Sequence, residues 1–129
     1  MTIDVIIKEV APRDGLQAQP KHLTLDQRQQ LIEALAITGL TELEIGSFVS
    51  PKAVPQMAGT DVLASQLPAQ SLDYSALVPN LRGYQLAKGA GITTMAIAVA
   101  ATEQMNQANI RMSLEQTFAM ADELLASAR

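Results

Sequence analysis

Short apolar runs alternate with helix-like segments four times along the chain, and this alternation limits the fold more than any other feature. The apolar runs predict strands at Ile3–Val10, Leu40–Ile45, Leu72–Val78 and Ile92–Val99. The fourth run is apolar on both faces, which is typical of a strand that is buried on both sides. Four strand–helix units of this kind predict an α/β fold with a parallel sheet and right-handed crossovers.

Helix signals fill the segments between the predicted strands. Thr24 to Gln27 and Ser113 to Gln116 both fit a capping box, which predicts helices over Thr24–Gly39 and Ser113–Ala128. A shorter helix is expected from about Thr60 to Leu67, and another from Asn80 to about Lys88. The apolar stripe of the last helix is predicted to be Leu114, Phe118, Ala121, Leu125 and Ala128.

Two architectures agree with this pattern, and periodicity alone does not choose between them. An open, doubly wound sheet would be complete at 129 residues. A (β/α)₈ barrel needs about 250 residues, so the chain would form roughly half of one. No glycine-rich phosphate loop follows the first strand, which weakens the dinucleotide-binding version of the open sheet. Polar, turn-rich segments follow all four strands, where barrel active sites are built.

The composition is that of one globular domain, residues 1–129, or part of one. Hydrophobic residues make up 48% of the chain, which is enough for a packed core. Charged residues make up 17%, which is too low for a disordered chain. The net charge of −4 argues against nucleic acid or an anionic membrane as the main partner. The absence of cysteine excludes disulfides, zinc–thiolate sites and cysteine catalysis within these residues. No targeting segment or membrane-spanning run is recognisable, so a cytoplasmic location is expected.

The hexapeptide Pro12–Gln17 directly follows the first predicted strand. Arg13 is a permanent cation, and Asp14 is a hard oxygen ligand beside it. Gly15 is expected to permit the backbone turn that presents both at the strand end. This arrangement suits a metal-assisted reaction in which negative charge develops on oxygen. The alternative is a surface turn that contains a local ion pair.

A second polar cluster surrounds the end of the second predicted strand. Glu42 and Glu44 share one face of that strand, and Glu44 lies nearer its carboxyl end. A buried carboxylate is costly unless it is paired, so Glu44 serves a site, points outward or pairs with an arginine. Ser47 and Lys52, in the predicted loop, could bind an anionic group or be ordinary loop residues. The single histidine, His22, is interpreted as an exposed loop residue.

Four sequence blocks, one after each predicted strand, together resemble the hydroxymethylglutaryl-CoA lyase family. They are Pro12–Gln17 (PRDGLQ), Gly46–Met57 (GSFVSPKAVPQM), Val78–Gly83 (VPNLRG) and the segment from Ala100 to Ile110. The resemblance covers the chain from Val5 to about Leu125. The first block also separates the lyases from related condensing synthases, which usually carry a threonine-leucine-arginine-aspartate version.

The resemblance implies a fold, a reaction and a set of site residues. The fold would be the N-terminal half, about four βα units, of a (β/α)₈ TIM barrel of the pyruvate-carboxyltransferase-like type. The reaction would be cleavage of 3-hydroxy-3-methylglutaryl-CoA, an acyl-CoA substrate, to acetoacetate and acetyl-CoA with Mg²⁺ or Mn²⁺. Asp14 would be a metal ligand, Arg13 would stabilise the enolate, and Glu44 would orient groups or relay protons. The implied substrate-binding residues are Gln17, Ser47, Lys52 and Asn80.

The chain also departs from the family pattern. The family takes its other metal ligands from a His-x-His pair and an asparagine late in the barrel, and its catalytic cysteine also lies there. Because residues 1–129 contain one histidine and no cysteine, they are expected to form an incomplete site that lacks normal lyase activity. Ala18-Gln19 replaces the usual Asn-Glu pair, which leaves a related acyl-CoA or 2-oxo-acid lyase or condensing enzyme open. A third interpretation is a non-catalytic half-barrel that self-associates through its open strand edges.

Overall fold

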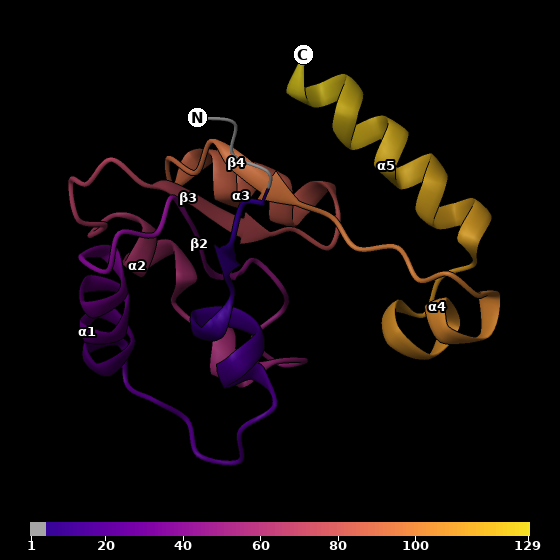
Figure 1. Cartoon of the computed structure of the whole chain (residues 1–129). Helices are drawn as coiled ribbons and strands as arrows, with labels where there is room; N and C mark the ends of the chain where they lie inside the picture. Colours follow the sequence, from indigo (N-terminus) through magenta and orange to yellow (C-terminus); the bar gives the residue numbers. More distant parts are fainter. Residues whose placement is uncertain (1–4) are drawn as a thin grey trace.

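The computed structural model describes residues 5–129 and contains one parallel sheet (Figure 1). Its strand order is β1-β2-β3-β4, and each neighbouring pair is parallel, as predicted. The strands are β1 (Lys8–Glu9), β2 (Glu42–Ser47), β3 (Asp73–Leu77) and β4 (Thr94–Ala96). Because the order in the sheet equals the order in the chain, β1 and β4 are its two edges.

Helices follow every strand, which confirms the four βα units. They are α1 (Leu25–Ala36), α2 (Thr60–Ala64), α3 (Leu81–Gly89), α4 (Glu103–Ile110) and α5 (Leu114–Ala128). Two short helical turns, η1 (Ala11–Gly15) and η2 (Pro55–Met57), complete the order. In the view of Figure 1, α1 and α2 lie to the left, and α4 and α5 lie to the right. Among residues 5–129, no helix combines the length and apolar character needed to cross a membrane.

Both predicted capping boxes are present with both of their hydrogen bonds. Thr24 Oγ1 accepts from the Gln27 N–H at 3.2 Å, and Gln27 Oε1 accepts from the Thr24 N–H at 3.0 Å. The same pair of bonds joins Ser113 and Gln116 at the start of α5. Side chains that satisfy free N–H groups fix where a helix begins, so these starts were predictable to the residue.

The two faces of the sheet differ in chemistry. One face packs on the helices and forms the core, in which Leu43, Ile45, Ala76 and Val78 meet Ile32, Leu63, Ala87 and Leu124. The opposite, inner face is polar. Lys8 Nζ lies 3.3 Å from Glu42 Oε2, and Thr94 Oγ1 donates to Asp73 Oδ1 at 2.8 Å. β2 therefore has an apolar side with Leu43 and Ile45 and a polar side with Glu42 and Glu44.

The edge strands are shorter and more exposed than predicted. The first strand was expected over Ile3–Val10, but only Lys8–Glu9 is a strand. Residues 3 and 4 lie outside the described residues, and Val5, Ile6 and Ile7 are exposed. The fourth strand is limited to Thr94–Ala96, and it is half-buried rather than buried on both faces. The reason is the same at both edges: each of these strands has a neighbour on one side only.

Three other boundaries also differ from the predictions. The second strand is shifted by two residues, so Ser47 lies in β2 and not in a loop. α1 ends at Ala36, and the turn that follows it reaches Gly39 with φ of +87°. α2 ends at Ala64 rather than at Leu67.

α5 buries Ala121 of the predicted stripe but not Phe118 or Leu125, and α4 was not predicted at all. The buried side chains of α5 are Thr117, Ala121 and Leu124, whereas Phe118 and Leu125 are exposed. A polar contact sets this face. Buried Asn106 of α4 donates from Nδ2 to Thr117 Oγ1 at 2.6 Å and to the Met112 carbonyl at 2.9 Å. Its Oδ1 accepts from the Ala100 N–H at 3.2 Å. A prediction that uses only apolar residues cannot identify the buried face of α5, because the side-chain amide of Asn106 on α4 binds Thr117 on that face.

Arg28 holds the loop after β2 against α1. Its Nη1 donates to the Ala58 carbonyl at 2.7 Å, and its Nη2 donates to Thr60 Oγ1 at 3.3 Å. Burial lowers the pKa of Arg28, because desolvation disfavours the charged form. Gly46 lies against this cluster, and a Cβ there would be 2.7 Å from Thr60 Oγ1 and 2.9 Å from Thr60 Cγ2. The absence of a side chain at Gly46 therefore permits the close packing.

Gly46→Ala is expected to lower the free energy of unfolding by about 1–3 kcal/mol, because it overpacks the contact with Thr60. Gly89→Ala is the matched control, since a Cβ at Gly89 meets no atom within 4 Å. The control is expected to leave stability unchanged or raise it by about 0.5–1 kcal/mol, since Gly89 ends α3. Urea unfolding followed by circular dichroism measures both variants. Equal free energies of unfolding for Gly46→Ala and Gly89→Ala would contradict overpacking at Gly46.

Candidate active site

The turn η1 begins at the carboxyl end of β1 and carries Arg13 and Asp14. The Val10 carbonyl accepts from the N–H groups of Arg13, Asp14 and Gly15 at 3.0, 2.8 and 3.5 Å. The segment is a π-helical turn and not the glycine-dependent turn expected from the sequence. Gly15 does not have a positive φ, so its conformation is open to any residue.

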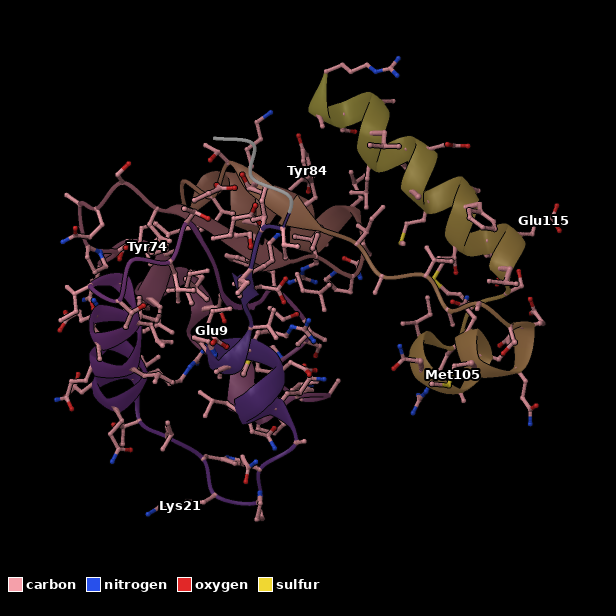
Figure 2. The ribbon with its side chains drawn as sticks, viewed as in Figure 1. Glu9, Lys21, Tyr74, Tyr84, Met105 and Glu115 are labelled. Atoms are coloured by element: carbon pink, nitrogen blue, oxygen red, sulfur yellow. The ribbon has the colours of Figure 1, made fainter. Side chains whose placement is uncertain are left out.

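Glu9 is a further residue at this turn that the sequence did not single out. Its Oε1 accepts from the Ala11 N–H at 2.7 Å, and Figure 2 shows it beside η1. Val10, the residue in the N-cap position, makes no side-chain capping bond. Glu9 therefore caps the turn in its place. The available signal was a carboxylate near the end of the first predicted strand, just before the turn.

Arg13 joins the two strand-end clusters that the sequence analysis identified separately. Its Nε donates to Glu44 Oε1 on β2, and its Nη1 donates to Asp14 Oδ1 at 3.0 Å. Glu44 is 3% exposed, whereas the Asp14 side chain is 67% exposed. Glu44 thus pairs with an arginine, which was one of the alternatives left open. The guanidinium lies between a buried carboxylate and a solvent-facing one.

This arrangement fixes the orientation of the guanidinium. Two of its nitrogens are held by carboxylates on different elements, so the plane of the group is set by β2 and η1 together. Within residues 5–129, Nη2 of Arg13 donates to no protein acceptor. A pre-positioned N–H donor of this kind can stabilise an oxygen that gains negative charge.

The other four predicted site residues do not join this network within the described part of the chain. Gln17 is half-buried just after η1, and Lys52 is exposed in the loop after β2. Ser47 is buried on β2, and its Oγ has no hydrogen-bond partner. Asn80 caps α3, where its Oδ1 accepts from the Gly83 N–H at 2.9 Å. All four follow or end strands at the carboxyl edge of the sheet, where ligands bind in parallel α/β folds.

The described residues do not fit a divalent-metal site by themselves. No three acidic, histidine or cysteine side chains in residues 5–129 come together in a way that could hold a metal ion. Asp14 is exposed, but Glu44 is already paired with Arg13. Mg²⁺ requires near-octahedral oxygen coordination, and one carboxylate does not provide it. His22 is exposed in its loop, as expected, and lies outside any such cluster.

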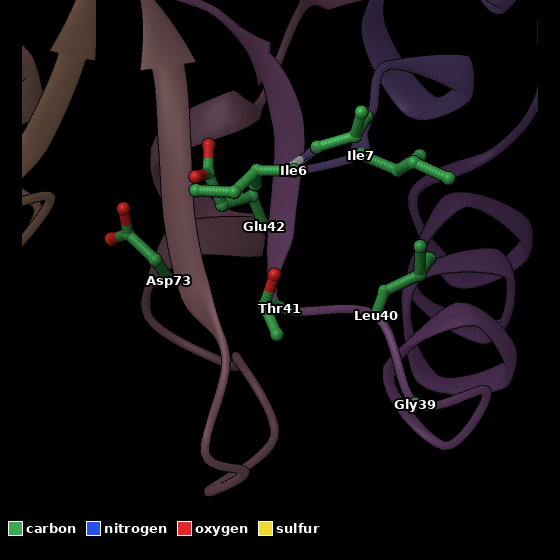
Figure 3. A pocket seen from close by; sticks show the side chains of 8 residues that line it. Ile6, Ile7, Gly39, Leu40, Thr41, Glu42 and Asp73 are labelled. Atoms are coloured by element: carbon green, nitrogen blue, oxygen red, sulfur yellow. The ribbon is translucent and has the colours of Figure 1, made fainter. Parts of the chain in front are cut away.

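Of two hollows that border the sheet in the described part of the chain, the larger one is not at the candidate site. It has a volume of about 520 Å³ and lies at the amino end of the strands, where Val5, Ile6 and Leu40 supply its apolar wall (Figure 3). A smaller one of about 160 Å³ lies after β2 and is lined in part by Ser47 and Thr60. Only the smaller hollow includes a predicted site residue.

Arg13→Met is expected to lower the free energy of unfolding by about 3 kcal/mol, because it leaves Glu44 buried without a partner. Glu44→Gln is expected to cost about 1 kcal/mol, since the more exposed Arg13 retains Asp14 and water. The double variant is expected to be more stable than the sum of the two predicts, by about 1–3 kcal/mol. Urea unfolding of the three variants gives this coupling. Asp14→Asn is the control and is expected to change stability little, because its ion pair is exposed. Additive effects would contradict the pairing.

The 129-residue chain is expected to show no saturable Mn²⁺ binding at micromolar concentrations, because Asp14 is the sole candidate ligand among the described residues. Electron paramagnetic resonance of free Mn²⁺ measures this directly. Micromolar binding that Asp14→Asn abolishes and Asp122→Asn preserves would show that a complete site exists.

The comparisons with known proteins agree with one another. A family model described as HMGL-like matches residues 4–129. The hydroxymethylglutaryl-CoA lyase of Pseudomonas mevalonii is 45% identical over 115 residues, which is 88% of this chain and 38% of that protein. The (R)-citramalyl-CoA lyase of Chloroflexus aurantiacus is 41% identical, over 88% of this chain and 39% of that protein.

Solved structures give the same result for the fold. A lyase structure from Acinetobacter baumannii, in complex with coenzyme A and 3-methylmalate, has a TM-score of 0.94 and 33% identity. The match covers 100% of this chain and 44% of that one. A hydroxymethylglutaryl-CoA lyase from Pseudomonas aeruginosa has a TM-score of 0.92 and 37% identity, over 97% of this chain and 42% of that one.

The chain spans about two fifths of the length of the curated relatives it matches. Its four parallel strands correspond to the N-terminal part of the TIM barrel of these lyases, which confirms the half-barrel and not the open sheet. The family model covers almost every residue of the chain. The chain therefore belongs to the HMGL-like family.

Proposed function

We propose that this chain supplies the β1–β4 part of an active site that cleaves a carbon–carbon bond in 3-hydroxy-3-methylglutaryl-CoA to give acetoacetate and acetyl-CoA. The observation that carries the proposal is the guanidinium of Arg13, which Glu44 and Asp14 hold at the carboxyl end of the strands. The sequence relatives are named as lyases of acyl-CoA thioesters, and one similar structure contains coenzyme A. These similar proteins thus have an acyl-CoA thioester or coenzyme A in common.

The proposed chemistry explains why a fixed cation belongs at this position. The substrate hydroxyl loses its proton, the bond between C2 and C3 breaks, and a ketone forms at C3. The electron pair of the broken bond moves onto the thioester as an enolate, and protonation at C2 yields acetyl-CoA. Arg13 stabilises the enolate oxygen through its free Nη2, and Glu44 keeps the guanidinium in place. Such pre-positioned donors act on the charge that develops during the reaction.

The remaining predicted residues have supporting roles in this proposal. Asp14 is the candidate ligand for Mg²⁺ or Mn²⁺, but the described residues do not form that site, so no step above depends on it. The buried Ser47 hydroxyl has no hydrogen-bond partner among residues 5–129, which suits a contact with a polar group of the substrate. Lys52 is exposed and suits an anionic group of the coenzyme A moiety. Gln17 and Asn80 are proposed to line the same edge.

A second candidate substrate is (R)-citramalyl-CoA, because its lyase from Chloroflexus aurantiacus is 41% identical to this chain. Both substrates are hydroxyacyl thioesters that would place an oxygen at Arg13. The residues described here do not separate them, so the experiment includes both.

A chimaera tests the proposal. Residues 5–129 replace the aligned N-terminal part of the Pseudomonas mevalonii lyase, and acetyl-CoA release is measured with each substrate. We expect cleavage by the chimaera and none by the 129-residue chain alone. Arg13→Met in the chimaera is expected to lower kcat/KM by about 10²–10³, as for the loss of a donor to a developing oxyanion. Arg13→Lys is expected to show a similar loss, because lysine lacks the planar fork that Glu44 and Asp14 hold.

Lys88→Met in the chimaera is the matched control. Lys88 is exposed near the C-terminus of α3, away from the carboxyl ends of the strands, so its loss is expected to leave kcat/KM unchanged. A folded chimaera that cleaves neither substrate, or one in which Arg13→Met has no effect, would contradict the proposed function.

A further inference from the structure

Arg28 is a buried cation that has no anionic partner in the described part of the chain. It is 2% exposed, and none of the ion pairs within residues 5–129 includes it. Its Nε also has no hydrogen-bond partner there. Burial of an unpaired charge is costly, and burial accordingly lowers the pKa of Arg28. Stability alone therefore does not account for an arginine at this position.

Both side-chain hydrogen bonds of Arg28 lead to the end of the loop that joins β2 to α2 (residues 48–59). Nη1 donates to the Ala58 carbonyl at 2.7 Å, and Nη2 donates to Thr60 Oγ1 at 3.3 Å. The Thr60 hydroxyl donates in turn to the Met57 carbonyl at 2.8 Å. One guanidinium on α1 thus holds the last part of this loop and the first residue of α2.

The loop between β2 and α2 has few other hydrogen bonds to the rest of the protein. At its start, the Phe48 N–H donates to the Leu77 carbonyl at 2.9 Å. Among the described residues, the one further hydrogen bond from the loop to another segment runs from Gln56 Nε2 to the Gln19 carbonyl at 3.3 Å, and it is exposed. Exposed hydrogen bonds restrain a segment less than buried ones. Arg28 is therefore the buried anchor of this loop.

The segment that Arg28 holds forms part of the wall of the smaller hollow. Met57 and Thr60 line this hollow of about 160 Å³ together with Ser47, whose buried hydroxyl has no partner among residues 5–129. The same loop carries Lys52, which is exposed. Ser47 and Lys52 are the residues proposed to meet polar groups of the substrate and of coenzyme A. The conformation of the loop therefore sets where these two side chains lie relative to each other.

Arg28 also packs on the strand that carries Glu44. A Cβ at Gly46 would lie 3.2 Å from Arg28 Nη2, so the guanidinium lies close to the backbone of β2. Glu44, two residues earlier in β2, holds Arg13 on the inner face of the sheet. The loop and the strand that border the candidate site thus share Arg28 as a support.

We propose that Arg28 is a positioning residue for acyl-CoA binding, because it fixes the loop between β2 and α2 in the conformation that brings Lys52 to the substrate beside Ser47. The identity of the substrate rests on the proposed function, whereas the fixing of the loop does not. Arg28 is buried and does not itself reach the substrate. Its loss therefore weakens binding more than it slows the cleavage of the carbon–carbon bond.

Trypsin cleavage after Lys52 measures the order of the loop in the 129-residue chain. Because proteases cleave segments that open locally, Arg28→Met is expected to raise this cleavage about tenfold relative to cleavage after Arg111, between α4 and α5. Gln30→Met, at an exposed position of α1, is the matched control and is expected to leave the ratio unchanged. An unchanged ratio in folded Arg28→Met, or an equal rise with Gln30→Met, would overturn the anchoring role.

Circular dichroism shows whether each variant is folded. If Arg28→Met does not fold, Arg28→Lys replaces it in the comparison, because lysine keeps the charge and one donor but loses the fork that reaches both Ala58 and Thr60. The ratio of cleavage after Lys52 is then expected to rise about threefold, since one of the two hydrogen bonds is lost. No rise with a folded Arg28→Lys would count against the anchor.

Kinetics of the chimaera test the consequence for binding. Arg28→Met in the chimaera is expected to raise KM for the acyl-CoA substrate about tenfold and to lower kcat by less than about threefold. A smaller folded fraction alone would lower the apparent kcat and leave KM unchanged, so a merely structural role gives a different result. Gln30→Met is expected to change neither parameter. An unchanged KM with Arg28→Met would overturn the positioning role.

The two measurements distinguish a failure of the Arg28 role from a failure of the proposed function. If Arg28→Met raises cleavage after Lys52 but the chimaera cleaves neither substrate, the acyl-CoA role fails together with the proposed function, and the fixing of the loop stands. If the chimaera is active but Arg28→Met changes neither the trypsin ratio nor KM, the proposed function stands and Arg28 is not a positioning residue.

Discussion

The division of the sheet into an apolar face and a polar face is the constraint on which the rest of the structure depends. Leu43 and Ile45 turn toward the helices, while Glu42 and Glu44 alternate with them on the inner face. The alternation brings carboxylates into a half-enclosed region, and each requires a cation. Lys8 and Arg13, from β1 and the turn after it, meet this need. The same pairs that stabilise the sheet thus place a fixed guanidinium at its carboxyl edge.

Features encoded by neighbouring residues were predictable from the sequence. The capping boxes at Thr24 and Ser113 are local, and both helices begin where those side chains place them. The order of the four strands followed from the apolar runs. The first family block contains Arg13 and Asp14, and Glu44 was singled out by its place near the carboxyl end of the second predicted strand. The contact between Arg13 and Glu44 was predictable only as an alternative, because 31 residues separate them in the chain.

The errors arose where a distant contact decides the outcome. The extent of β1 and β4 depends on whether a strand lies beside them, which the composition of the strand does not reveal. The buried face of α5 depends on the amide of Asn106, which binds Thr117 from another helix. The turn at Gly15 was misinterpreted because glycine suggests a positive φ, whereas the Val10 carbonyl gathers three N–H groups into a π-helical turn. β2 extends to Ser47 because its pairing with β3 continues past a register shift between Glu44 and Gly46.

The polar inner face has a consequence for how the chain behaves when it is not enclosed. A conventional sheet with one uncovered apolar face would stack on copies of itself and precipitate. Here the face carries charged side chains that are paired with each other, Lys8 with Glu42 and Arg13 with Glu44. Stacking of one such face on another would have to desolvate these pairs, so it is disfavoured. A chain that exposes this face while it folds is therefore less prone to association than one that exposes an apolar face.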